Sequence, residues 1–110
     1  MSWLEDFLPG PVVARTSSYT VPPCNGQVIM VGTLGAGITI TLPAEPVLGQ
    51  LVAVKRTGAF DNTITIDGNG KTIDGTATLS ALLSHNLAAV WLCYNGSAWS
   101  VLSSYYVLLA

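Results

Sequence analysis

The chain has 110 residues, of which 50% are hydrophobic and 9% are charged, whereas about 25% are charged in a typical soluble protein. Such a composition excludes an intrinsically disordered chain, because disordered segments are polar and rich in charge. Four basic residues and a net charge of −2 also exclude the basic surface with which proteins bind nucleic acids or anionic membranes. We therefore expect one apolar domain with no nucleic-acid and no membrane partner.

The first eleven residues form a segment distinct from the rest of the chain. Four apolar residues recur there at helical spacing and would share one face of a short helix: Trp3, Leu4, Phe7 and Leu8. Ser2 and Glu5 match a capping box, and Pro-Gly-Pro at residues 9–11 ends the helix. A helix this short is unstable alone, so the segment either folds back onto its own domain or inserts into a groove of a partner. We favour the second, with residues 1–11 as a docking peptide and hinge.

Residues 12–110 form the predicted body, in which apolar residues alternate with a period of two. Residues 37–42 and 62–66 alternate isoleucine with threonine, the pattern of half-buried strands. Further strands are predicted at residues 18–21, 27–33, 50–57, 71–74, 77–82, 87–94, 99–103 and 105–110. Five dipeptides are typical of hairpin turns: Asn25-Gly26, Asp67-Gly68, Asn69-Gly70, Asp74-Gly75 and Asn95-Gly96. The fold class is therefore all-β, an antiparallel β-sandwich or jelly-roll-like domain.

Two of these strands are apolar on both faces, at residues 28–31 and 87–94. In an antiparallel sheet this pattern means that the second face is also covered. Because the body is small, we expect a neighbouring subunit, rather than the same chain, to cover this second face. The longest apolar run, residues 87–94, is far below the roughly 18 residues of a membrane span.

Catalytic and metal-binding motifs are missing from the sequence. His85 is the one histidine, and we interpret it as a loop residue that caps a backbone group, since no G-x-S-x-G elbow accompanies it. Residues 67–71 begin like a calcium loop, but Lys71 takes a ligand position and Thr78 stands in place of the bidentate glutamate. Hairpin turns explain Asp67 and Asp74 better, and the alternative is that Asp61, Asp67 and Asp74 converge on a cation across a trimer axis. We expect no enzyme, no metal and no cofactor.

The cysteines and aromatic residues leave two alternatives open. Cys24 and Cys93 are too few for a disulfide scaffold, so buried thiols are favoured over a single bridge. Tyr94 and Trp99 flank the Asn95-Gly96 turn and are candidate glycan-binding residues, because exposed rings stack on sugars. Trp91 lies within an apolar strand and is assigned to the core.

Several segments of the body resemble β-domains of bacteriophage virion proteins. They are Gly-Ile-Thr-Ile-Thr-Leu-Pro at 37–43, Leu-Gly-Gln at 48–50, Val-Ala-Val-Lys at 52–55, Asn-Thr-Ile-Thr-Ile-Asp-Gly-Asn-Gly-Lys-Thr-Ile-Asp-Gly at 62–75, and Trp-Leu-Cys-Tyr-Asn-Gly-Ser-Ala-Trp at 91–99. Tail fibres, tailspikes, head fibres and capsid decoration proteins share such segments. The resemblance covers about residues 18–103 and implies a structural, usually trimeric and non-enzymatic virion module, with no catalytic residues to transfer.

From the resemblance and the docking peptide together we expect a homotrimer that is assembled in the host cytoplasm and located in the virion. Its three peptides would bind another virion protein of the capsid, neck or tail, and the body would project outward. Three linked peptides gain avidity, so each contact can be weak. The alternative is a tail-associated module that binds a host surface glycan through Tyr94 and Trp99.

Overall fold

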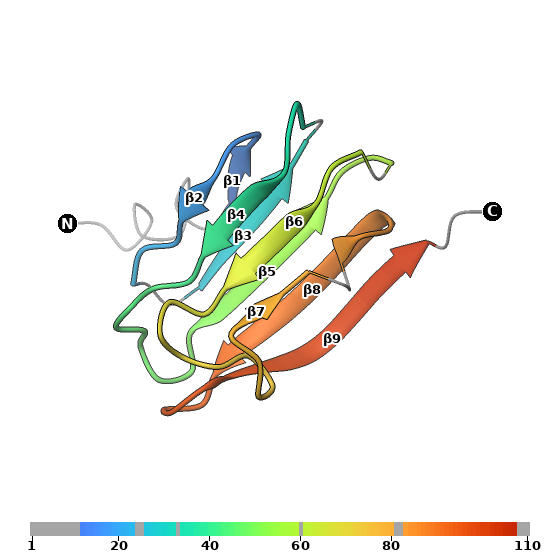
Figure 1. The fold of residues 1–110 in the computed structure, drawn as a ribbon. Coiled ribbons are helices and arrows are strands. Elements are labelled where there is room, and N and C mark those ends of the chain that lie inside the picture. Colours follow the sequence, from blue (N-terminus) through green and yellow to red (C-terminus); the bar gives the residue numbers. More distant parts are fainter. Residues whose placement is uncertain (1–11, 24–25, 33, 60, 81–82, 108–110) are drawn as a thin grey trace.

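The described residues form nine strands, which lie in two layers (Figure 1). The computed structural model describes residues 12–23, 26–32, 34–59, 61–80 and 83–107. The strands are β1 (Val12–Arg15), β2 (Tyr19–Thr20), β3 (Gly26–Val31), β4 (Ile38–Thr41), β5 (Leu51–Arg56), β6 (Ile64–Asp67), β7 (Thr78–Leu79), β8 (Asn86–Tyr94) and β9 (Trp99–Val107). The expected all-β class is confirmed for this part of the chain.

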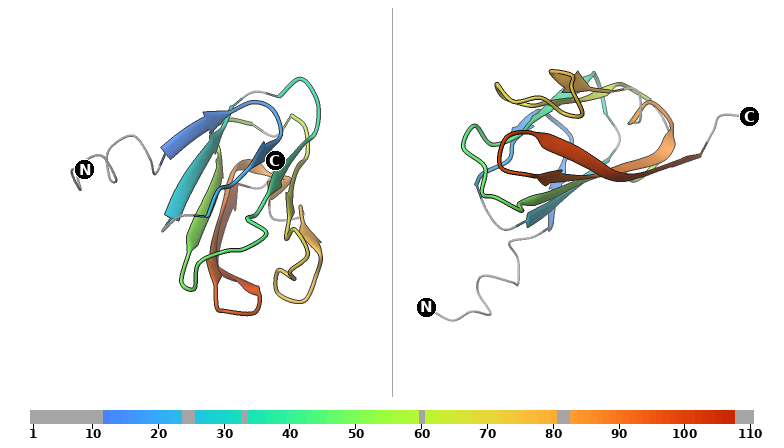
Figure 2. Two further views of the ribbon diagram at one scale, coloured as in Figure 1. Left: turned by 90° about the vertical axis from the view of Figure 1, so that its left-hand side faces the viewer. Right: turned by 90° about the horizontal axis from the view of Figure 1, so that it is seen from below.

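Successive strands from β1 to β6 alternate between a five-stranded and a four-stranded sheet. The five-stranded sheet has the order β1-β3-β5-β8-β9, and the four-stranded sheet has the order β2-β4-β6-β7. The chain therefore winds three times around a common core, and each winding contributes one strand to each sheet (Figure 2). Strands β7, β8 and β9 follow after the third winding.

Strands of successive windings pair in parallel, so the expectation of antiparallel sheets is wrong for this part of the fold. β1, β3 and β5 are parallel to one another, and so are β2, β4 and β6. Parallel neighbours need a crossover connection, and here the crossover from one strand to the next runs through the opposite sheet. Antiparallel pairing begins only with β7, β8 and β9, where the chain turns back on itself.

Two tight turns with glycine lie in the part of the chain that follows the windings. Asp74 and Gly75 have positive φ angles of 47° and 88° and form a tight turn beside β9. Gly96, with φ of 102°, lies in the β8–β9 hairpin, where the Asn95 amide donates to the Ala98 carbonyl at 3.0 Å. Glycine accepts these backbone angles without steric cost. These two predicted turns are confirmed.

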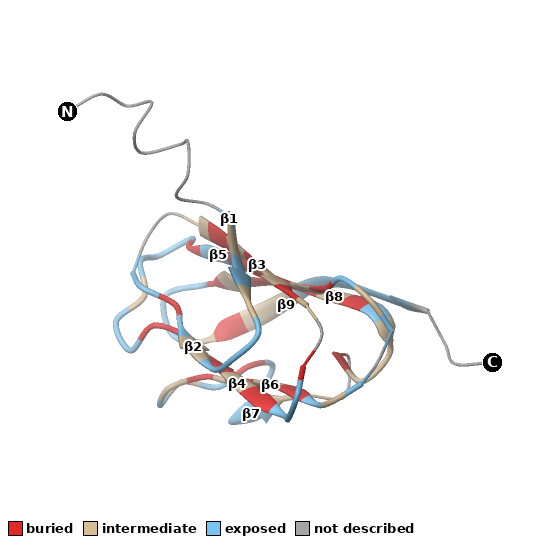
Figure 3. Ribbon diagram, turned by 90° about the horizontal axis from the view of Figure 1, so that it is seen from above, coloured by how far each residue is buried: buried red, intermediate tan, exposed pale blue. Residues whose placement is uncertain are grey.

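The core fills the space between the two sheets (Figure 3). In the four-stranded sheet the alternating isoleucines stack in register, Ile38 on Ile64 and Ile40 on Ile66. All four point inward and are buried. The five-stranded sheet supplies Ile29, Val31, Val52, Val54, Val90 and Leu92 to the same cluster. The Ile-Thr alternation thus predicted correctly which residues enter the core.

The predicted strands differ most from the observed ones in three places, and elsewhere their ends shift by a few residues. The segment Val12–Arg15, for which no strand was expected, pairs with β3 as β1. Residues 99–103 and 105–110 were expected as two strands, but β9 runs continuously over Trp99–Val107 with an irregular register. Residues 71–74 form an isolated bridge through Ile73 and not a strand.

Candidate functional site

The outer face of the five-stranded sheet is the most unusual surface of the described chain. Side chains of a strand alternate between two sides, and those opposite the core form a set that we call the outer face: Val12, Ala14, Val28, Met30, Leu51, Ala53, Lys55, Leu87, Ala89, Trp91, Cys93, Ser103 and Tyr105. Trp91 is 44% exposed and Tyr105 is 56% exposed. Most members of this set are apolar, and their exposure varies: Ala53 is 5% exposed and Val12 is 57% exposed.

Strand pairing aligns these side chains in rows across the sheet. Val12 pairs with Val28, Val28 with Ala53, Ala53 with Trp91, and Trp91 with Ser103. Paired residues point to the same side of a sheet and lie close enough to touch. Trp91 therefore stands between two small side chains in the row that spans all five strands.

Lys55 is the charged member of the outer face. Its Nζ atom donates to the Leu87 carbonyl at 2.6 Å and lies 5.2 Å from the centre of the Tyr105 ring. Both contacts hold the ammonium group along the sheet, and the ring adds a cation–π attraction. The ammonium group is therefore held against the sheet by a carbonyl and a ring, with its positive charge retained.

The outer face of the four-stranded sheet has the opposite character. Its outward residues include Thr39, Thr41, Thr65 and Asp67, which alternate with the buried isoleucines. Threonine suits a strand and its hydroxyl is hydrated by water. One sheet thus presents polar side chains to solvent, while the other presents apolar ones.

A buried arginine forms the strongest polar cluster of the described residues. The Arg56 side chain at the end of β5 is 1% exposed. It donates to the Asp61 carboxylate at 2.9 Å, to the Asn62 carbonyl at 2.6 Å and to the Leu83 carbonyl at 3.1 and 3.3 Å. Asp61 also accepts from the Leu34 amide at 2.7 Å. Arg56 thus fastens two loops to the end of β5, and Asp61 connects them to a third loop at Leu34.

Two opposing effects act on the ionisation of this pair. Burial lowers the pKa of Arg56, while the nearby Asp61 carboxylate raises it. The pKa of Asp61 is lowered, chiefly by the hydrogen bond from the Leu34 amide and also by the Asn62 amide and the Arg56 charge. Each of the three stabilises the carboxylate form. The pair is a structural clamp, and no described nucleophile contacts it.

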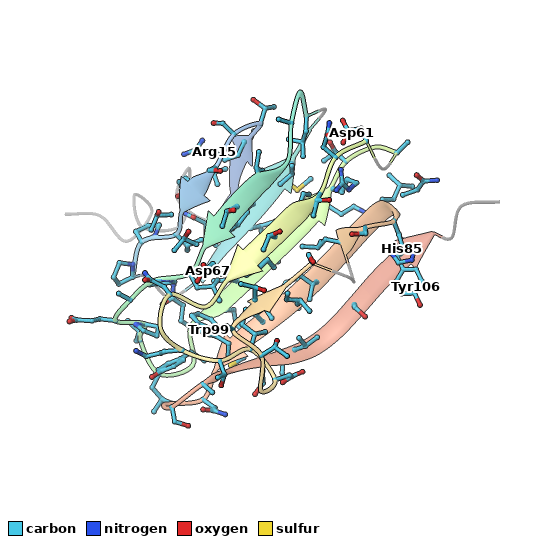
Figure 4. The ribbon with its side chains drawn as sticks, in the orientation of Figure 1. Arg15, Asp61, Asp67, His85, Trp99 and Tyr106 are labelled. Carbon is cyan, nitrogen blue, oxygen red and sulfur yellow. The ribbon has the colours of Figure 1, made fainter. Side chains whose placement is uncertain are left out.

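The three aspartates that were considered for a cation site lie apart. Asp61 precedes β6 and Asp67 ends it, so the two lie at opposite ends of that strand (Figure 4). The carboxylate of Asp67 accepts from the Asn69 amide, and that of Asp74 accepts from the Val101 amide. Among the described residues no three histidine, cysteine, aspartate or glutamate side chains gather as metal ligands would. Turn formation is therefore the observed role of Asp67 and Asp74.

The aromatic residues occupy positions other than those expected. Tyr94 and Trp99, the candidate glycan-binding residues, are 7% and 1% exposed and pack together in the core with ring centres 5.4 Å apart. Trp91, which was assigned to the core, points outward instead. Both faces of β8 are apolar, so the sequence did not show which face enters the core. The structure buries Tyr94, and Trp91, three residues earlier in the same strand, points to the opposite side.

The remaining candidates are dispersed. His85 stacks on Tyr106 with ring centres 4.2 Å apart (Figure 4), and Ser84 donates its hydroxyl to the Ser80 carbonyl rather than to the histidine. Cys93 is a half-buried free thiol. The anchor residues Trp3, Leu4, Phe7 and Leu8, and also Cys24, lie outside the described residues.

A small pocket of about 250 Å³ lies where the parallel strands β1, β3 and β5 end. It is lined by Ala14, Arg15, Thr16, Met30, Gly32 and Thr57. Arg15 lies 4.2 Å from the centre of the Tyr19 ring and donates to the Ala14 carbonyl. The lining combines one cation with two hydroxyl groups and contains no carboxylate.

The comparisons with known proteins identify no family for this chain. No helix within the described ranges is long and apolar enough to cross a membrane. Comparison of the chain with protein-family models and with curated protein sequences finds no match.

Proposed function

We propose that the protein is a non-enzymatic structural subunit of a bacteriophage virion, a homotrimeric decoration or fibre protein. The observation that carries the structural role is the apolar outer face of the five-stranded sheet. Exposed apolar patches of this extent mark surfaces at which proteins associate. The assignment to a phage virion rests on the resemblance of residues 37–43 and 62–75 to virion β-domains.

In this proposal the two parts of the chain have separate tasks. Residues 1–11 attach the subunit to a capsid, neck or tail protein through Trp3, Leu4, Phe7 and Leu8. The two-sheet body, of the β-sandwich type, projects outward and associates with its copies. The buried cluster formed by the described residues between 12 and 107 supports this division, because it gives the body a core of its own.

Two measurements test the proposal. Native mass spectrometry of the full chain at micromolar concentration is expected to give three times the chain mass of 11.5 kDa. Phage particles that lack the protein are then incubated with the full chain or with residues 12–110. We expect the full chain to sediment with the particles and the shortened chain to stay in solution while retaining its β circular-dichroism spectrum. A monomeric full chain, or a shortened chain that still attaches, would contradict the proposal.

A glycan-binding module remains the second candidate, and one observation favours it. Tyr105 and Tyr106 are 56% and 42% exposed at the end of β9, beside Lys55 and His85. Rings with nearby polar groups can bind sugars. If this candidate is right, Tyr105→Ala should abolish binding on a glycan array and leave the melting temperature within about 2 °C of the wild type, as expected for a surface substitution.

A further inference from the structure

We infer that the outer face of the five-stranded sheet is the surface through which copies of this chain bind one another. The inference rests on the proposed structural function, to which it adds the surface and the residues of self-association. Three properties of the face favour another copy of the chain as its partner: the apolar character of its side chains, its area and the shape of its surface.

The chemistry of the face requires an apolar partner without buried charges. No carboxylate belongs to the described outer face, and Lys55, its one cation, is already bound to the Leu87 carbonyl and the Tyr105 ring. A partner with carboxylates or amines opposite Val28 and Trp91 would leave these groups desolvated and unpaired, which is costly. The same face on a second copy is apolar at the matching positions, whereas the threonine-rich face of the other sheet is not.

The area of the face is sufficient for a stable contact. Its five strands contain four to nine residues each. Strands about 4.8 Å apart with a rise of about 3.3 Å per residue give a projected area of roughly 500 Å². The relief of the side chains enlarges the accessible area beyond this projection, toward the approximately 800 Å² that each partner buries in a standard interface.

The relief of the face suits packing against another sheet. Trp91 rises between Ala53 and Ser103, two small side chains that are its paired neighbours. A large exposed ring, such as Trp91 at 44% exposure, can interdigitate with the side chains of a second apolar face, as in stacked sheets about 10 Å apart. A sugar site at Trp91 would instead need several polar groups around the ring, and here its paired neighbours supply only the Ser103 hydroxyl.

A charge placed on this face tests the inference. Trp91→Lys puts an ammonium group on the outer face, on the strand next to the central strand β5, and Thr65→Lys puts the same group on the outer face of the four-stranded sheet as a matched control. Association is measured by sedimentation velocity over a range of concentrations, and circular dichroism checks the fold. We expect Trp91→Lys to weaken association about 30-fold or more, the effect of removing an interface hot spot, and Thr65→Lys to associate like the wild type.

Leu51→Lys provides a second variant in case Trp91→Lys does not fold, because Leu51 is 37% exposed on the same face. Variants that remain folded and associate as strongly as the wild type would overturn the inference but leave the homotrimer standing. A monomeric wild type would overturn both. A wild-type dimer that only the outer-face variants dissociate would support the inference and contradict the proposed trimer.

Discussion

Replacing Arg56 with alanine is expected to lower the free energy of unfolding by about 3 kcal/mol, near the lower end of the range for breaking a buried ion pair. The guanidinium is buried and donates four hydrogen bonds to Asp61, Asn62 and Leu83. Its removal leaves the Leu83 and Asn62 carbonyls without these donors, at about 1–3 kcal/mol for each buried group. The Asp61 side chain is 29% exposed, so water can hydrate its carboxylate once Arg56 is removed. This hydration keeps the loss in the free energy of unfolding near the lower end of the range for a buried ion pair.

Urea unfolding followed by far-ultraviolet circular dichroism measures this loss. All variants are compared at one protein concentration, because association stabilises the folded state by mass action. The matched control is Arg15→Ala, which removes a half-buried arginine that packs on the Tyr19 ring and is expected to cost at most about 1 kcal/mol. A loss below about 1 kcal/mol for Arg56→Ala, or equal losses for the two variants, would refute the clamp described above.

Three further predictions concern stability. Gly68→Ala should destabilise the fold by at least about 2 kcal/mol, because a Cβ atom there would overlap the Lys71 carbonyl; Gly35→Ala, with open space around it, should be nearly neutral in the same urea titration. Ile66→Ala should cost about 2–5 kcal/mol, since Ile66 is fully buried; a loss under 1 kcal/mol would contradict the assigned core. The pKa of Asp61 is lowered in the folded state, so its ionised carboxylate stabilises the fold at pH values above the ordinary aspartate pKa of about 3.9. This stabilisation disappears as the pH falls through the lowered pKa. Thermal unfolding between pH 6 and pH 2 should therefore show a smaller acid-induced loss for Asp61→Asn than for the wild type, and equal losses would count against this assignment.

The apolar outer face could be predicted from the sequence only in part. The apolar character of both faces of residues 28–31 and 87–94 predicted that part of the body would need a cover, and the structure places Val28, Leu87 and Trp91 on an uncovered face. The prediction placed Trp91 in the core and Trp99 at the surface, whereas in the structure Trp99 is buried and Trp91 is exposed. Hydrophobicity is equal for Trp91 and Trp99, and only the contact of each strand with the opposite sheet separates them.

Local chemistry in the sequence was enough to determine the all-β class, the inward isoleucines of β4 and β6, and the turns at residues 74–75 and 95–96. These features depend on neighbours along the chain: alternation follows from the pleat, and positive φ angles follow from glycine. The direction of strand pairing depends instead on which segments meet in space. A period of two is the same in parallel and antiparallel sheets, so only the tertiary structure could show that the chain winds between two sheets. Likewise, only the tertiary structure brings the carbonyl of Leu83, 27 residues along the chain, to the Arg56 guanidinium.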